Sequence, residues 1–206
     1  MNRISFAALL GSIAMFIRVY TAYELLPIGG IGLHKLPNEI AVLEALQKNI
    51  AENSGIYLFP RLWLEANPPG KEFAEEMACY PSGILMYNAA GSRVSAISHW
   101  WLVEFLNELA QAVLTVFLLS RTRLTTFGAR LTFVLLVGML TAIATNVGYL
   151  NWYGFPWSYT LASMFIQVVG FLCMGLVAAF VLKKQTFGAP SGRGFLPGIL
   201  PATLRG

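Results

Sequence analysis

The stretch that decides the fold is Trp100–Leu119, which reads WWLVEFLNELAQAVLTVFLL. Its length is about the 20 residues that a helix needs to cross the hydrocarbon core of a bilayer. Two glutamates, Glu104 and Glu108, lie inside this apolar run. A charged side chain at the bilayer centre costs about 2.5–3.5 kcal/mol on insertion scales. We therefore predict a membrane-spanning helix whose acidic side chains avoid lipid.

Three further apolar blocks accompany this stretch. The chain of 206 residues is 56% hydrophobic and 12% charged, whereas about 25% of the residues in a soluble domain are charged. The apolar excess lies in four blocks, Ile4–Leu26, Trp100–Leu119, Leu131–Leu150 and Tyr159–Leu182. Backbone polar groups in lipid must be satisfied within each segment, which favours helices. We predict an all-α integral membrane protein with four transmembrane helices, residing in a bacterial inner membrane.

The first block has two interpretations. Arg3 ahead of an apolar run is typical of a secretory signal peptide as well as of a first transmembrane helix. The run is longer than the roughly 7–15 apolar residues of a signal peptide, and no small-residue cleavage site follows it. We therefore predict that residues 1–26 form a retained transmembrane helix, and that helices 2–4 occupy residues 98–184.

Eight of the 14 basic residues are expected to lie on one side of the membrane. They precede the first block, connect the second and third, and follow the fourth: Arg3, Arg121, Arg123, Arg130, Lys183, Lys184, Arg193 and Arg205. Cytoplasmic segments are enriched in Lys and Arg, so we predict both termini inside and residues 27–97 outside. Residues 185–206 are rich in Gly and Pro and are predicted to be a flexible tail. Contact with the lipid bilayer explains this basic segment without nucleic acid.

The 27–97 segment is predicted to form a small extracytoplasmic α+β region. Residues 38–53 are predicted to be a helix capped by Asn38, because apolar residues recur at helical spacing. These apolar residues are Ile40, Leu43, Leu46 and Ile50. Their face should pack on the membrane surface, on the helix ends or on the rest of the loop. Residues 55–60 and 83–88 are predicted to be strands that pair antiparallel.

Polar residues of the second span form one stripe. Glu104, Asn107, Glu108 and Gln111 follow the spacing i, i+3, i+4, i+7, which puts them on one helix face. Counting about 1.5 Å per residue from Ser98, Glu104 lies about 9 Å deep and Glu108 about 15 Å deep. The stripe is therefore expected to face other helices or a water-filled cavity.

Arg18 is the expected counter-ion of this stripe. It lies in the outer half of the first span, at a depth like that of Glu104, and we expect no other basic residue to be buried. One arginine cannot neutralise two carboxylates, so we predict that one glutamate pairs with Arg18. The other should carry a proton or bind a cation. The third and fourth spans offer matching polar groups in Thr145, Asn146 and Gln167.

Other chemistry is weakly indicated. His99 is five residues before Glu104 and points to another side of the helix, and no Glu-x-x-His or His-x-x-x-His spacing occurs. We therefore predict no metal site, and no cofactor is indicated. The chain has no P-loop, GxSxG or HExxH motif, so an enzyme is not indicated either.

Two functions remain open, beside a purely structural network that fixes helix packing. The first is an intramembrane carboxylate site for binding or transporting a proton, a cation or a polar ligand. The second is a non-catalytic accessory or scaffolding subunit of a larger respiratory or photosynthetic membrane complex. A stripe that faces the bundle interior, with Arg18 near Glu104, favours the first. A stripe that points outward favours the second.

Overall fold

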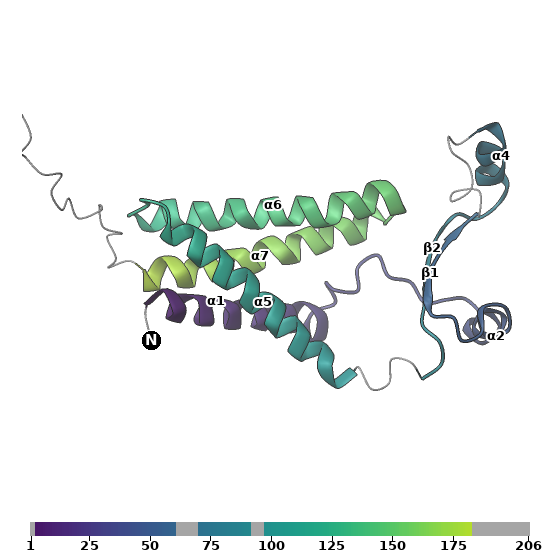
Figure 1. The fold of residues 1–206 in the computed structure, drawn as a ribbon, viewed down its shortest axis with the longest axis horizontal. Helices are drawn as coiled ribbons and strands as arrows, with labels where there is room; N and C mark the ends of the chain where they lie inside the picture. Colours follow the sequence, from purple (N-terminus) through teal and green to yellow (C-terminus); the bar gives the residue numbers. More distant parts are fainter. Residues whose placement is uncertain (1–2, 61–69, 92–96, 183–206) are drawn as a thin grey trace, which may run out of the picture.

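Four long helices form the body of the protein (Figure 1). The computed structural model describes residues 3–60, 70–91 and 97–182. The long helices are α1 (Arg3–Tyr20), α5 (Ile97–Ser120), α6 (Phe127–Tyr153) and α7 (Trp157–Val181), and α1 continues as a π-helical turn, η1 (Thr21–Leu25). All four are long and apolar enough to cross a membrane. The prediction of a mainly helical protein with four such segments is confirmed.

Local capping explains why α6 is longer than the apolar block that predicted it. The Thr126 side chain accepts a hydrogen bond of 3.2 Å from the Ala129 N–H at the helix start, as N-cap residues do. The helix ends at Gly154, whose φ of 66° is left-handed and favours glycine. The Phe155 N–H then donates to the Tyr149 carbonyl over 3.4 Å. This tight turn brings the start of α7 back against the end of α6.

The helices are not equally packed against one another. α7 packs closely against both α1 and α6, whereas α5 packs chiefly against α1 and makes little contact with α6. In Figure 1, α5 crosses the other helices obliquely and leans away from α6 at the end from which residues 26–96 leave the bundle. We call this end the loop end. α5 and α6 therefore diverge towards the loop end.

The apolar core lies in the half of the bundle away from the loop end. It consists of Ala7, Ala8, Met15, Ala112, Val116, Leu119, Val134, Phe171, Met174, Ala178 and Leu182. Glycines permit close approach here, because a Cβ at Gly138 would lie 2.5 Å from the Phe171 Cβ. A Cβ at Gly175 would lie 2.9 Å from Leu131. The bundle is thus tightly packed at one end, which leaves room for a cavity at the other.

Arg130 corrects one prediction. We expected Arg18 to be the only buried basic residue, but Arg130 is fully buried near the start of α6. Its Nε donates to the Leu124 carbonyl over 2.9 Å, and its Nη1 donates to the Leu182 carbonyl at the end of α7. The last carbonyls of a helix lack partners within the helix and carry partial negative charge. A basic residue in a cytoplasmic cluster was expected to face water, but this one caps a neighbouring helix.

Replacing Arg130 with methionine is expected to lower the stability of the bundle by about 2 kcal/mol, because two carbonyls lose charged donors. Thermal unfolding of the detergent-solubilised protein measures this change. Arg123→Met, at an exposed site in the same connection, is the control and should unfold as wild type does. Equal unfolding temperatures for the two variants would contradict the capping role.

The described residues between η1 and α5 form an arm that reaches away from the loop end (Figure 1). It contains α2 (Glu39–Ile50), β1 (Gly55–Phe59), α4 (Lys71–Cys79) and β2 (Gly83–Tyr87). The strands pair antiparallel, with Gly55 opposite Tyr87 and Tyr57 opposite Leu85. The hairpin is tied to the end of α2, since the Tyr87 hydroxyl donates to the Ala51 carbonyl over 2.9 Å. The predicted small two-stranded sheet is present.

The apolar face of α2 is only partly covered by the described parts of the chain. None of its residues is buried: Ile40 is 74% exposed and Leu43 is also exposed, whereas Leu46 and Ile50 are half-buried. The described chain therefore covers this face only near the end of α2. The membrane surface remains an expectation. Asn38 occupies the N-cap position, but its side chain makes no capping hydrogen bond.

Candidate functional site

A polar cavity lies at the loop end, between η1, α1, α5, α6 and α7. Its volume is about 250 Å³. Its lining includes all eight polar residues that the sequence singled out: Arg18, Glu104, Asn107, Glu108, Gln111, Thr145, Asn146 and Gln167. The structure thus brings together side chains from four helices that are far apart in sequence.

An ion pair lies in the lining of this cavity. The Arg18 Nη2 donates to the Glu108 Oε1 over 2.8 Å, and the two side chains are only 12% and 3% exposed. Gly170 of α7 makes room for the guanidinium, because a Cβ there would lie 2.7 Å from both Cζ and Nε of Arg18. Three helices therefore contribute to one buried interaction: α1 supplies the cation, α5 the anion and α7 the space.

The identity of this pair differs from the one that depth counting favoured. Arg18 was placed level with Glu104, yet it bonds Glu108, one turn further along α5. Side chains on a helix lean towards its N-terminus. Since α1 and α5 run in opposite directions (Figure 1), Arg18 leans away from the loop end and Glu108 leans towards it. The opposite directions of these two side chains bring the Arg18 guanidinium and the Glu108 carboxylate together, although their backbones lie at different depths.

The pair leaves two buried atoms unsatisfied. Among the described residues, the buried side-chain nitrogen and oxygen atoms without a hydrogen-bond partner are the Arg18 Nε and the Glu108 Oε2. Buried polar atoms almost always have a partner, whether from the protein or from ordered water. Both belong to residues that line the cavity. The ion pair is thus not fully satisfied by the described chain.

Glu104 is the second carboxylate of the site. It is half-buried and lines the polar cavity together with Arg18 and Glu108. Among the described lining residues, Arg18 is the only basic one. Because Arg18 already bonds Glu108, the charge of one carboxylate has no counter-ion within the lining.

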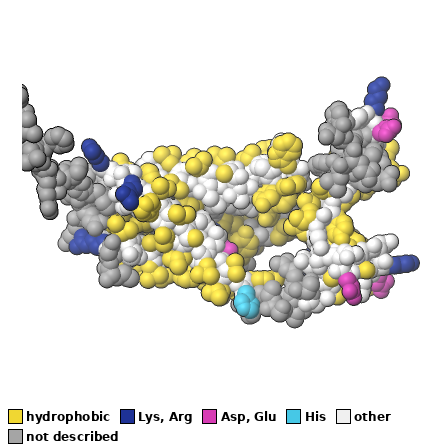
Figure 2. Space-filling view, viewed as in Figure 1, with side chains coloured by type: hydrophobic (Ala, Val, Ile, Leu, Met, Phe, Trp, Pro, Cys, Tyr) yellow, Lys and Arg dark blue, Asp and Glu magenta, His cyan; other side chains and the backbone are white. Residues whose placement is uncertain are grey.

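The cavity opens sideways between α5 and α6. Asn107 of α5 and Thr145 of α6 line it and are also exposed. Figure 2 shows a mainly apolar bundle surface with an acidic side chain in a hollow beside α5. The opening follows from the divergence of α5 from α6 towards the loop end.

The wall opposite α5 is a fixed polar network between α6 and α7. The Asn146 Nδ2 donates to the Gln167 Oε1 over 3.2 Å and to the Ala142 carbonyl over 2.9 Å. Asn146 is buried, so these bonds hold its amide in one orientation. This network positions two amide side chains at the cavity without using either carboxylate.

Several lining residues were not singled out from the sequence. They are Val19, Tyr23, Tyr149, Phe155, Tyr159, Ser163 and Ile166. Gly170, which leaves space for the Arg18 guanidinium, was not singled out either. One signal was present, because Tyr159, Ser163 and Gln167 recur every four residues and form a second polar stripe. Tyr23, Tyr149 and Tyr159 lie near the ends of apolar blocks, where aromatic residues are common whatever their role, and Gly170 carries no distinguishing pattern.

Metal ligands are not assembled in the described parts of the chain. Within residues 3–60, 70–91 and 97–182, no group of three or more His, Cys, Asp or Glu side chains could hold a metal ion. His34 and His99 are exposed and are not among the lining residues. The polar groups of the lining are instead two carboxylates together with amides and hydroxyls, which suit hydrogen bonding and the binding of hard cations.

Comparisons with known proteins identify no relative. No protein-family model, curated protein sequence or solved structure matches the chain. The class defined by the fold is a helical protein with four helices that could cross a membrane. The polar cavity between these helices is the starting point for its function.

Proposed function

We propose that the chain is an integral membrane protein that binds, and transports, a small cationic or polar species in the cavity beside Glu104. The observation that carries this proposal is the presence of two carboxylates and one guanidinium in a single cavity among apolar helices. Ionisable residues within membrane segments are costly and generally mark ion, proton or substrate sites. A proton or a cation on Glu104 balances the remaining charge.

The contents of the cavity support a site more than a packing network. A network that only fixes helix packing satisfies its polar groups mutually, as Asn146 and Gln167 do here. The Arg18–Glu108 pair differs, since each partner keeps a buried atom without a partner in the described chain. A cavity of about 250 Å³ beside these atoms has room for an occupant.

The proposed orientation follows the distribution of charge. Arg3, Arg121 and Arg123 are exposed at the end of the bundle away from the loop end, and Figure 2 shows Lys and Arg gathered there. By the positive-inside rule this end faces the cytoplasm. The arm and the cavity then lie towards the outer side of a bacterial inner membrane.

Glu104→Gln tests this function, because it removes the charge without breaking the Arg18–Glu108 pair. The purified full-length chain is titrated with NaCl, KCl, NH₄Cl and acid while its thermal unfolding is followed in detergent. A bound ion at a hundredfold excess over Kd stabilises the folded state by about 2.7 kcal/mol. We expect at least one of these to raise the unfolding temperature of wild type and not that of Glu104→Gln.

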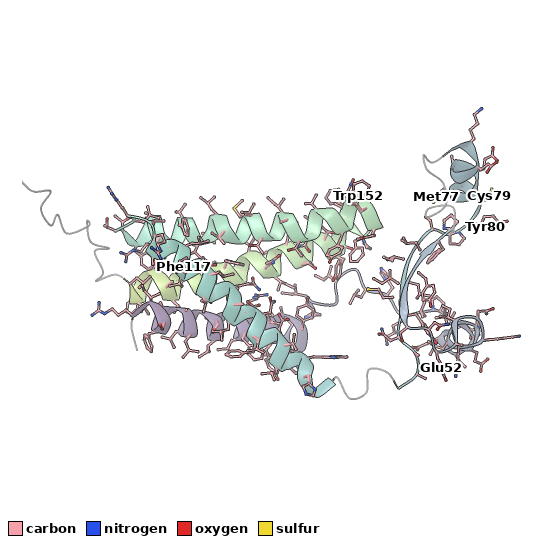
Figure 3. The ribbon with its side chains drawn as sticks, viewed as in Figure 1. Glu52, Met77, Cys79, Tyr80, Phe117 and Trp152 are labelled. Carbon is pink, nitrogen blue, oxygen red and sulfur yellow. The ribbon has the colours of Figure 1, made fainter. Side chains whose placement is uncertain are left out.

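Glu52→Gln is the matched control, because Glu52 lies on the arm, away from the bundle (Figure 3). It should respond to every ion as wild type does. Proteoliposomes loaded with a dye for the responding ion then report transport, which Glu104→Gln should abolish. If wild type and Glu104→Gln respond identically to all four titrants, the proposal of a binding site is contradicted and the polar residues only fix helix packing.

An accessory role in a larger membrane complex is the second candidate, and the arm favours it. Large apolar side chains are exposed there: Ile40, Leu43, Ile56, Tyr80 and Met86. Exposed apolar groups of this kind mark interaction surfaces. Gentle detergent extraction followed by a native gel tests this role. Co-migration with a large complex supports it, whereas a band of the size of the chain alone contradicts it.

A further inference from the structure

We propose that the occupant of the cavity is a small organic ammonium ion, held by Glu104 and the aromatic side chains of Tyr149, Phe155 and Tyr159. This inference rests on the proposed function and names the ligand class of the same site. The three rings line the cavity that contains the carboxylate. They come from the end of α6, the connecting turn and the start of α7.

The rings form one continuous wall. Tyr149 and Phe155 are stacked with their centroids 5.3 Å apart, and Phe155 meets Tyr159 edge-to-face at 5.5 Å. The left-handed turn at Gly154 and the bond from the Phe155 N–H to the Tyr149 carbonyl fix this arrangement. The wall is therefore a product of the α6–α7 turn.

The chain that leaves η1 packs against the aromatic residues from outside. A Cβ at Gly32, whose φ is 82°, would lie 2.7 Å from the Tyr159 Cβ. A Cβ at Gly29 would lie 2.7 Å from Cγ of Tyr23, a fourth aromatic residue of the lining. Glycine at both positions allows the backbone to hold Tyr23 and Tyr159 against the cavity.

Phe155 and Tyr159 are less exposed than the tryptophans at the same end of the bundle. Trp152 and Trp157 are 69% and 67% exposed and are not among the lining residues. Figure 3 shows Trp152 pointing away from the bundle at the loop end of α6. Phe155 and Tyr159, in contrast, are half-buried against the cavity. Anchoring in a lipid headgroup region accounts for the first pair only.

The combination of ring faces with a carboxylate selects the chemistry of the ligand. Aromatic faces attract cations, and proteins recognise alkylated ammonium groups in this way. Glu104 supplies the opposite charge that an ammonium ion needs, and the described residues provide no cluster for a transition metal. The volume of about 250 Å³ is roughly eight times the ~30 Å³ of one water molecule in the liquid. The cavity therefore suits an ammonium ion with a few carbon atoms.

The experiment measures binding of choline chloride to the purified full-length chain by isothermal titration calorimetry and thermal shift. Dimethylbutanol, the uncharged carbon isostere of choline, and NaCl are the comparison titrants. We expect dimethylbutanol to bind at least about tenfold more weakly than choline, because it loses the charge-assisted contact. We expect Glu104→Gln to weaken choline binding by a similar factor.

Phe155→Leu tests the ring wall, since leucine keeps apolar bulk and removes the ring face. It should weaken choline binding about fivefold, the size of one cation–π contact. Phe155→Tyr should bind as wild type, which keeps the test valid if the leucine variant fails to fold. Trp152→Leu is the matched control from the same end of α6, and it should leave binding unchanged.

The outcomes separate this inference from the proposed function. Equal binding of choline and dimethylbutanol overturns the ammonium assignment, as does wild-type binding by Phe155→Leu. Stabilisation by Na⁺, K⁺ or protons without choline binding overturns the assignment and leaves the proposed function in place. Failure of every titrant to distinguish wild type from Glu104→Gln overturns both.

Discussion

Arg18→Met is expected to be the most damaging single substitution in the bundle. It leaves the Glu108 carboxylate, whose side chain is 3% exposed, without the guanidinium that it bonds at 2.8 Å. Removing one partner of a buried ion pair typically costs about 3–5 kcal/mol, because the remaining charge is uncompensated. Thermal unfolding in detergent should therefore show a large fall in the unfolding temperature.

A double-mutant cycle separates the pair from the loss of either side chain. Glu108→Gln should cost less than Arg18→Met, because Arg18 can turn to Glu104 in the same cavity. The double variant Arg18→Met/Glu108→Gln should recover most of the lost stability, since no buried charge is then left without a partner. If the double variant is as unstable as the sum of the single variants, the two residues do not act as a pair.

Gly170→Ala is expected to disrupt the site although it adds only one methyl group. The new Cβ would lie 2.7 Å from both Cζ and Nε of Arg18, so the guanidinium would have to shift from its position beside Glu108. Combining the cost of overpacking with that of a weakened ion pair, we expect a loss of about 3 kcal/mol. The response to the cation identified by the Glu104→Gln experiment should also be lost.

Two glycines of α6 provide matched controls for this substitution. A Cβ at Gly148 meets no atom within 4 Å, so Gly148→Ala should be neutral or stabilise the helix by up to about 1 kcal/mol. A Cβ at Gly138 would lie 2.5 Å from Phe171 in the apolar core, so Gly138→Ala should cost about 1–3 kcal/mol. Its cation response should persist. Loss of that response in Gly138→Ala as well would show that Gly170 acts through general packing.

Helical periodicity explains how much of the site the sequence could reveal. The spacing of Glu104, Asn107, Glu108 and Gln111 determines which face of α5 is polar, whatever the helix packs against. Apolar length likewise determines where a membrane-crossing helix can form. Periodicity was sufficient to select the four polar residues of α5, and all eight polar residues predicted from the sequence are among those that line the cavity.

The features that the sequence could not reveal depend on the arrangement of helices in space. Whether Arg18 meets Glu104 or Glu108 depends on the tilt of α5 and on side-chain lean. The role of Gly170 depends on the distance between α7 and the Arg18 guanidinium. Phe155 lines the cavity because the α6–α7 turn stacks its ring on that of Tyr149. Arg130 caps α7 because the Leu182 carbonyl, at the end of that helix, lies within hydrogen-bond distance of its guanidinium. None of these relations leaves a periodic pattern in one chain.

The oblique packing of α5 has a mechanical consequence. α5 packs mainly against α1 and hardly against α6. We therefore expect its loop end to swing about the short connection to α6, residues 121–126. Glu104 lies about 24 Å along the helix from Ser120, so a swing of about 5° displaces it by roughly 2 Å. Thr145, Asn146 and Gln167 lie on α6 and α7, which pack tightly together. We therefore expect any swing of α5 to change the distance between the Glu104 carboxylate and these three polar side chains.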